Sequence, residues 1–268
     1  NQNGGTLNVY NIGIGYNAGA AITSAVQTTL IGGLAGDAIT TGEFNTVVGY
    51  NALSTATTGG RNVAMGWSSL RNVSGAGNRY NSALGFSTGE NITSGVQNTI
   101  VGGLAGTTIV DGDNLTVLGY NAEPSAANAT DEVTLGDSGV SALRCAVTTI
   151  TAISDERDKT NIEELPYGLD FVDSLKPKKF VWDHRPEIKK EVDAEGNETE
   201  VEFYSSRKGS KDIGFIAQEL DQIDDEYTRL VYKSNPDKLE ASYGRLIPIL
   251  VKAIQELSAE VKELKSKI

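Results

Sequence analysis

A short motif that recurs at nearly constant spacing dominates the first 153 residues and restricts the folds open to them. Eight copies of an aliphatic residue or Met followed by Gly are regularly spaced, and the steps between their glycines are 17, 17, 17, 19, 17, 17 and 17 residues. The glycines are Gly15, Gly32, Gly49, Gly66, Gly85, Gly102, Gly119 and Gly136. A period of this length is typical of a solenoid, whose units bury their apolar faces only by stacking on one another.

Each repeat unit has the composition of a strand and its turns. In one unit the β-branched run Thr46, Val47 and Val48 precedes the glycine, and the polar residues 54–60 that follow are turn formers. Seventeen residues are too few for a helix, a strand and their connections, so we expect two short strands and two turns per unit. Residues 1–153 are therefore predicted to form an all-β fibre, a β-roll or β-solenoid.

The repeat is also similar to glycine-punctuated repeats that wind three chains into one rod. Its hydrophobic-Gly-x-x-Ala/Ser pattern resembles the head repeats of trimeric adhesins and of bacteriophage tail-fibre shafts. The resemblance implies a homotrimer, in which the Gly and Ala positions would let three backbones approach closely. Two roles stay open for such a rod, a stiff spacer or a tip that contacts a host-surface receptor, either a glycan or a protein.

Aromatic residues often follow the repeat glycine. They are Tyr16, Tyr50, Trp67, Phe86 and Tyr120. In register they would form a ladder that is either packed between coils, the interpretation we favour, or exposed as a stripe on which sugars stack. The carboxylates of this part form no pair in equivalent units, so a glycan-cleaving site is not indicated.

The composition changes abruptly at Ser154. Residues 1–153 contain 25 Gly, one Pro and no Lys, whereas residues 154–268 hold 19 of the 23 basic and 26 of the 35 acidic residues. The change predicts two domains, 1–153 and 154–268. The net charge of −12 opposes binding to nucleic acid and to an anionic membrane surface, and no apolar run is long enough to cross a bilayer.

The second part is predicted to be an α+β domain. We expect a helix within 163–175, a strand at 179–182, an exposed loop or hairpin at 187–202, a buried strand turning into a helix at 212–220, and a strand at 230–232.

A long amphipathic helix over about 241–268 is predicted to follow. Its apolar residues advance in alternating steps of three and four, which is typical of a coiled coil. They are Tyr243, Leu246, Leu250, Ile254, Leu257, Val261 and Leu264. Pro248 should kink this helix or mark its first turn. Association between chains is the interpretation we favour, and packing on the domain's own core is the alternative.

The residues that open the second part could carry chemistry. Ser154 and Lys159 are close enough in sequence for the hydroxyl and the amine to meet, and a serine becomes a nucleophile when a base removes its proton. Arg157 would favour the neutral amine, while Asp155 and Asp158 would oppose it. The alternative is structural, with Ser154 or Asp155 capping a short turn and Lys159 solvated.

Other chemistries find little support in the sequence. Cys145 is the one cysteine, so no disulfide can form within a chain, and a reducing compartment fits. His184 is the sole histidine and the only possible member of a Ser-His-Asp triad. One Cys and one His exclude a zinc cluster, and we expect neither a metal nor a cofactor.

Three motifs in order resemble the endosialidase-type intramolecular chaperone domains of bacteriophage tail spikes and tail fibres. They are Ser154-Asp155-x-Arg157-x-Lys159-x-Asn161-Ile162, the run 214–219 (Gly-Phe-Ile-Ala-Gln-Glu), and the terminal run from Tyr243 to Leu257. The resemblance covers about 115 residues and departs from any pattern in the acidic loop 187–202 and at Asp183-His184.

The resemblance implies an activity, self-cleavage. Such a domain trimerises, helps the preceding β fibre fold in register and releases itself, here between Ile153 and Ser154. Ser154 would be the nucleophile and Lys159 the general base, with Asp155, Arg157 and Asn161 supporting them. The mature fibre would belong to the virion tail and serve host attachment, with assembly in the host cytoplasm. The alternative is a trimeric fibre whose C-terminal domain caps and registers it without cleavage. A DNA-binding regulator, known among eukaryotic relatives, fits an acidic glycine repeat poorly.

Overall fold

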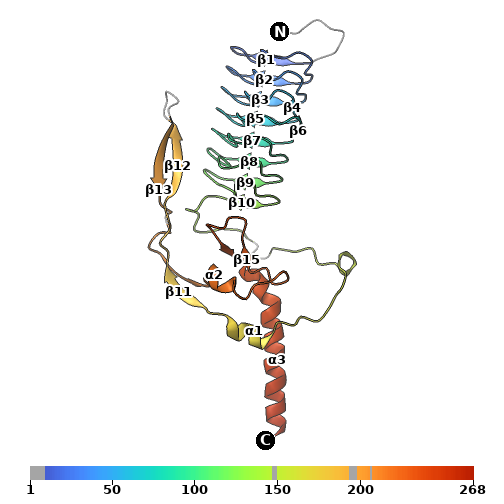
Figure 1. The fold of residues 1–268 in the computed structure, drawn as a ribbon, viewed down its shortest axis with the longest axis vertical. Helices are drawn as coiled ribbons and strands as arrows, with labels where there is room; N and C mark the ends of the chain where they lie inside the picture. The colour runs from blue at the N-terminus through green and yellow to red at the C-terminus, as the bar shows by residue number, and fades with distance from the viewer. Residues whose placement is uncertain (1–9, 147–149, 193–197, 206) are drawn as a thin grey trace. The chain divides into compact units, whose positions relative to one another are not determined.

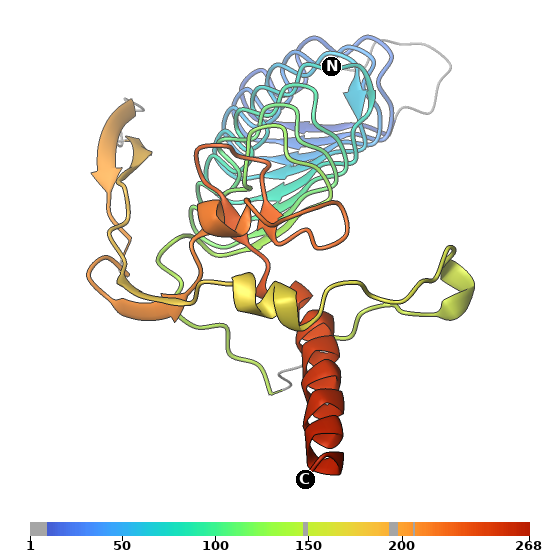
Figure 2. The same cartoon turned by 60° about the horizontal axis from the view of Figure 1, so that its bottom comes forward.

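The computed structural model describes residues 10–146, 150–192, 198–205 and 207–268. The chain divides into two compact units, Asn1–Val140 and Ser141–Ile268. Figure 1 shows the first as a stack of parallel strands, and Figures 1 and 2 show the second as short strands and helices with one long C-terminal helix. Residues 141–153, which precede the predicted boundary at Ser154, group with the C-terminal unit.

The first unit is a β-solenoid, as the repeat predicted. One strand per coil joins an eight-stranded parallel sheet in the order β1-β2-β3-β5-β7-β8-β9-β10. The strands are β1 (Ile12–Ile14), β2 (Thr29–Ile31), β3 (Thr46–Val48), β5 (Val63–Met65), β7 (Ser82–Leu84), β8 (Thr99–Val101), β9 (Thr116–Leu118) and β10 (Val133–Leu135). Each pairs residue for residue with the next, so Ile12 lies opposite Thr29 and Thr29 opposite Thr46. The repeat spacing therefore sets the register.

Most of each coil is turn rather than strand, which corrects the expectation of two strands per unit. Among the described residues, pairing outside the eight-stranded sheet of the solenoid is limited to β4 (Gly59–Gly60) with β6 (Gly77–Asn78) and a single parallel bridge between Asp113 and Thr130. Left-handed backbone recurs at the residue two positions before the strand, for example at Phe44 (φ 60°) and Gln97 (φ 62°). Such residues turn the chain and prevent a longer extended run.

The repeat glycine is required by stacking within one chain. Gly32 has φ +133°, and a Cβ there would lie 2.5 Å from the carbonyl oxygen of Gly49 in the next coil. The sequence-based explanation, close approach of three backbones, is therefore not needed for these glycines. The alanines that follow them are also internal, since Ala35, Ala52 and Ala105 are fully buried in the solenoid core.

The solenoid interior contains an apolar column and a polar one. The middle residue of most strands points inward, as Leu30, Val47 and Ile100 do. The residue before the strand is often a buried Asn, and these form a ladder. Asn81 Oδ1, for example, accepts a hydrogen bond from the backbone N–H of Asn98 at 3.0 Å, and Asn98 Nδ2 donates to Gly112 O at 2.8 Å. The ladder satisfies backbone groups at the bend that leads into the sheet.

The second unit has the predicted α+β character. Its elements are η1 (Glu156–Asp158), α1 (Leu169–Ser174), β11 (Lys178–Val181), β12 (Glu187–Val192), β13 (Glu198–Phe203), β14 (Lys211–Gly214), α2 (Ala217–Leu220), β15 (Val231–Tyr232), β16 (Glu240–Ala241), η2 (Tyr243–Arg245) and α3 (Leu246–Ser266). Three antiparallel pairs form, β11 with β14, β12 with β13, and β15 with β16. The acidic stretch is thus a hairpin rather than an open loop.

Two details differ from the expectation. The helix expected within 163–175 begins only at Leu169, since Gly168 stands at its N-cap with a non-helical backbone (φ −136°, ψ −129°). The strand before α2 is not buried, because Ile213 in β14 is 79% exposed. Among the described residues, β14 pairs with one strand, β11.

The core of the second unit is small. It is formed by Leu220, Leu230, Val231, Leu246 and Ile249. Pro248 lies in the first turn of α3, where a proline is tolerated. It therefore marks the start of the helix, which was one of the two expectations. The buried residues of α3 end at Ala253, and the apolar residues beyond it, Ile254, Leu257, Val261 and Leu264, are exposed.

Candidate functional site

Ser154 and Lys159 meet in the structure. The Nζ of Lys159 lies 2.7 Å from the Oγ of Ser154 and 3.1 Å from the carbonyl oxygen of the same residue. These are hydrogen-bond distances for an amine and a hydroxyl. The pair has the geometry that a serine and its general base require.

The intervening residues bring the two side chains together by forming η1, one turn of 3-10 helix. Asp155 stands at its N-cap, and its Oδ1 accepts a hydrogen bond from the backbone N–H of Arg157 at 2.9 Å. Lys159 follows the turn with extended backbone, and its own N–H donates to Glu156 O at 3.1 Å. Of the two caps that the sequence allowed, Asp155 fills this position. The hydroxyl of Ser154 is thereby left to Lys159.

Arg157 does not act on Lys159 as the sequence suggested it could. Its Nε and Nη2 donate to the two carboxylate oxygens of Asp155 at 3.0 and 2.6 Å. These bonds, and then the one from the Arg157 backbone, lower the pKa of the Asp155 carboxyl, and the pairing raises the pKa of the Arg157 guanidinium. The two charges offset each other, so the pair shapes the turn and supplies no net cation beside the amine.

The peptide bond between Ile153 and Ser154 lies in an exposed segment. Ile153 is 93% exposed, and Ser154 and Lys159 are exposed as well. Residues 150–155 belong to no helix or strand. The single chain therefore holds the hydroxyl and the amine together on an exposed segment.

The remaining candidates lie apart from this hydrogen bond. Asn161 adopts the left-handed conformation (φ 52°), which redirects the chain just after Lys159. His184 stacks on Trp182 with ring centroids 4.8 Å apart. Within the described residues no group of three or more His, Cys, Asp or Glu side chains is arranged to hold a metal ion. No helix there has the length and apolar character needed to cross a bilayer.

The apolar positions of the terminal helix divide into two sets. Tyr243 and Leu246 contact their own unit, since the Tyr243 hydroxyl accepts a hydrogen bond from Phe215 N–H and Leu246 is buried in the core. The other five are 40 to 65% exposed. They are Leu250, Ile254, Leu257, Val261 and Leu264. An exposed apolar seam on a helix is typical of a surface that packs against another helix.

Sequence analysis did not identify the role of Glu256, which lies in α3. Its Oε2 accepts a hydrogen bond from Leu169 N–H at 2.7 Å, so a carboxylate from α3 satisfies the first turn of α1. Gly168 leaves room for this carboxylate, because a Cβ there would overlap it. A single sequence does not indicate that Gly168 and the distant Glu256 lie together.

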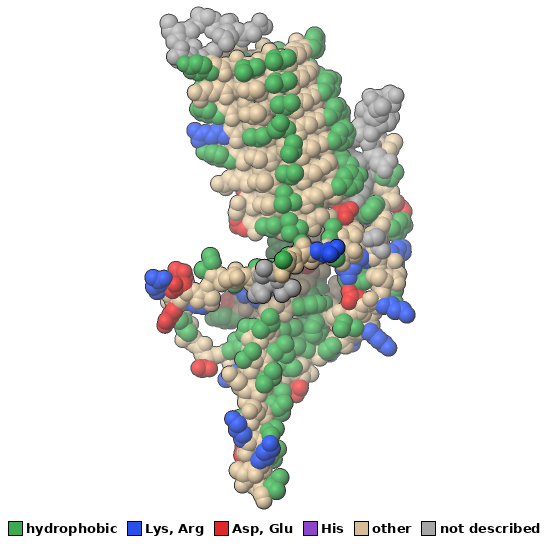
Figure 3. Space-filling model, turned by 180° about the vertical axis from the view of Figure 1, so that it is seen from behind, with side chains coloured by type: hydrophobic (Ala, Val, Ile, Leu, Met, Phe, Trp, Pro, Cys, Tyr) green, Lys and Arg blue, Asp and Glu red, His purple; other side chains and the backbone are tan. Residues whose placement is uncertain are grey.

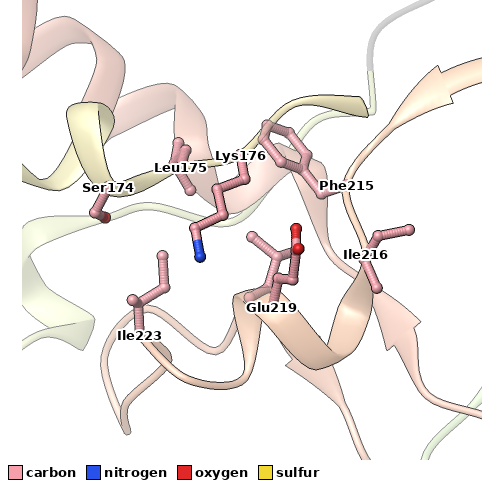
Figure 4. A pocket seen from close by; sticks show the side chains of 8 residues that line it. Ser174, Leu175, Lys176, Phe215, Ile216, Glu219 and Ile223 are labelled. Carbon is pink, nitrogen blue, oxygen red and sulfur yellow. The ribbon is translucent and has the colours of Figure 1, made fainter. Parts of the chain in front are cut away.

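A small cavity lies beside α1 and α2 (Figure 4). Leu175, Phe215, Ile216 and Ile223 are among the residues around it. Its volume of about 10 Å³ holds one water at most. It is a packing defect of the small core and offers no ligand site.

The structure combines a β-solenoid with an α+β unit that contains the Ser154–Lys159 pair and ends in a helix with exposed apolar residues. Residues 154–231 match the model of a peptidase family described as chaperone of endosialidase. The match lies within the C-terminal unit and begins at Ser154. A search of curated proteins and a search of solved structures gave no match.

Proposed function

We propose that this chain is the C-terminal part of a bacteriophage tail fibre or tail spike whose domain 154–268 assembles three chains and then cuts itself away between Ile153 and Ser154. The observation that carries the proposal is the 2.7 Å contact between Lys159 Nζ and Ser154 Oγ. It supports the assignment because it falls at the first residue of the family match.

The chemistry would proceed as an acyl transfer followed by hydrolysis. Lys159 takes the hydroxyl proton of Ser154 while Oγ attacks the carbonyl carbon of Ile153. The bond between that carbon and the Ser154 nitrogen breaks, and Lys159 returns the proton to the leaving amine. Water then hydrolyses the ester on Oγ, which leaves a carboxylate on Ile153 and a free amino terminus on Ser154.

Assembly would precede cleavage. Three α3 helices joined along the exposed seam hold three chain ends at high local concentration, which favours winding the solenoids in register. Long-range β pairing among identical chains is otherwise slow and prone to error. The exposure of Lys159 supports this order, because packing between chains would supply the desolvation that the single chain lacks. Cleavage then separates the fibre from the domain that assembled it, so the fibre cannot unfold by the same path and is kinetically trapped.

The mature solenoid would belong to the virion tail, with host attachment as its use and the host cytoplasm as the place of assembly. A trimeric fibre with a non-cleaving registration cap is the second candidate. It is favoured by one observation, the solvated state of Lys159, and it differs from the first only in the use of Ser154 and Lys159.

The experiment is expression of the full chain followed by a denaturing gel and intact mass. We expect two fragments, residues 1–153 and 154–268, and a trimer before denaturation. Ser154→Ala should give one intact chain that still forms trimers. Thr160→Ala removes a hydroxyl from the same exposed segment without touching the pair, and it should cleave as the wild type does. One uncut wild-type chain, or cleavage of Ser154→Ala at the same bond, would reject the assignment.

A further inference from the structure

The sheet of the solenoid has an apolar outer row that the described residues of its own unit leave partly exposed. The row consists of the third residue of each strand of the eight-stranded sheet, which is Ile, Val, Leu or Met from Ile14 in β1 to Leu135 in β10. Leu84 is 50% exposed, and its neighbours Met65 and Val101 are 37% and 39% exposed. In Figure 3 hydrophobic side chains run as continuous stripes along the stacked coils.

Aromatic residues widen this row. Tyr16, Tyr50, Phe86 and Tyr120, each two residues after a member of the row, are 40 to 77% exposed. The rings lean along the solenoid, since Trp67 and Phe86 stack at 4.8 Å and the Tyr50 ring lies over Gly33. The packing that we favoured from the sequence is therefore partial, and one side of the ladder faces outward.

The face is also uncharged. The first and third residues of the eight strands point outward, and none of them is Asp, Glu, Lys or Arg. The charged residues of residues 10–140 all lie in the turns, where Glu43, Arg71 and Asp111 are examples. Eight rungs at about 4.8 Å spacing make a strip roughly 34 Å long, and apolar patches of that size mark interaction sites.

The regular spacing of the apolar row restricts the kind of surface that can pack along its whole length. A surface that meets every rung must repeat at the same spacing along the same direction, and a second copy of this solenoid does so. A face without charges is compatible with itself, whereas a row of like charges would repel its copies. We propose that the apolar row is the surface along which the solenoids of neighbouring copies of this chain pack in parallel; this inference rests on the proposed homotrimer and names the face that it uses.

The test uses the full chain with Ser154→Ala, which keeps it whole, and Cys145→Ser, which removes the native thiol. A single cysteine is placed in the row as Leu84→Cys or, in a second variant, Val101→Cys. Thr58→Cys is the matched control, because Thr58 is exposed and lies in a turn outside the sheet. A short bismaleimide should link Leu84→Cys chains to one another and leave Thr58→Cys chains single. In the assembled protein the Leu84→Cys thiol should react with a bulky maleimide at least about tenfold more slowly than the control thiol.

A fourth variant separates this inference from the proposed function. Leu264→Cys reports association through α3 alone. Crosslinking at Leu264 without crosslinking at Leu84 or Val101 would overturn the inference and leave the helix-driven trimer standing. Crosslinking at Leu84 with an uncut wild-type chain would uphold the face and reject the self-cleavage. A thiol at Leu84 that stays freely reactive in the assembled protein would mean an open face, available to saccharide or lipid, and would likewise overturn the inference.

Discussion

The amine of Lys159 contacts both polar atoms of Ser154, Oγ at 2.7 Å and the carbonyl oxygen at 3.1 Å, although five positions separate the two residues. One turn of 3-10 helix at residues 156–158 makes this possible, because it turns the chain so that the side chain of Lys159 lies beside Ser154. The geometry depends on the residue that caps the turn. The residues around the pair are therefore expected to control the rate of cleavage without taking part in the chemistry.

Asp155 is the first of these residues. We expect Asp155→Ala to slow self-cleavage roughly fivefold, because the turn loses its cap and Lys159 meets Ser154 less often. Asp155→Asn keeps an oxygen for the Arg157 backbone N–H and should restore most of the rate. Time courses on denaturing gels measure both. Equal rates for Asp155→Ala and the wild type would mean that the turn does not position the amine.

Lys159 itself can be tested by a change that keeps the charge. A guanidinium stays protonated in proteins and cannot accept the proton of Ser154. Lys159→Arg should therefore lose at least about 100-fold in cleavage rate, the usual contribution of a general base. An active Lys159→Arg variant would exclude the amine as the base.

The sequence predicted the fold of the first unit well, because the repeat period determines that fold. A 17-residue spacing leaves little choice but stacked coils, and the register follows from the spacing alone. The number of strands per coil was wrong, because left-handed turns at residues such as Phe44 and Gln97 give no clear composition signal. The buried Asn ladder was missed, although Asn45, Asn62, Asn81 and Asn98 recur at the repeat spacing and could have been found.

For the candidate site, the sequence indicated two residues whose side chains meet in the structure, but it did not indicate their surroundings. Motif spacing indicated that Ser154 and Lys159 could meet, and they do. It could not tell that Arg157 would bind Asp155 rather than act on Lys159, because Arg157 lies two residues from each of them. The contact of Glu256 with α1 depends on a separation of 87 residues, and a long-range pair of this kind is visible only after the chain has folded.

The repeat glycine gives a stability prediction with a control in the next position. Gly102 has φ +137°, and a Cβ there would overlap the carbonyl oxygen of Gly119. Gly103 meets only the Tyr120 ring, at 3.7 Å. We expect Gly102→Ala to destabilise the solenoid by about 3 kcal/mol or more and Gly103→Ala to change stability by about 1 kcal/mol or less. Thermal unfolding followed by circular dichroism measures both. Similar midpoints for the two variants would show that the coils do not stack as closely as described.

Asp224 gives a prediction for the second unit that depends on pH. Its carboxylate accepts hydrogen bonds from the N–H groups of Leu230 (2.6 Å) and Val231 (3.2 Å) and from the Thr228 hydroxyl (2.8 Å). Partial burial acts to raise the pKa of Asp224, but these bonds together outweigh it, and the pKa is lowered. Asp224→Ala leaves the buried Leu230 N–H without this acceptor and should cost about 1–3 kcal/mol.

The sign of the pH effect follows from the lowered pKa. Ionised Asp224 stabilises the folded domain above the ordinary pKa of an unfolded aspartate, about 3.9, and this contribution is lost as the pH falls through the lower folded pKa. The difference in unfolding free energy between the wild type and Asp224→Asn should therefore be largest near neutrality and shrink below about pH 4. Urea titrations followed by tryptophan fluorescence measure this difference. They use the Ser154→Ala background with Trp67→Phe, so that Trp182 is the one fluorescent tryptophan. A difference that stays constant down to pH 3 would mean that the charge of Asp224 contributes nothing to the fold.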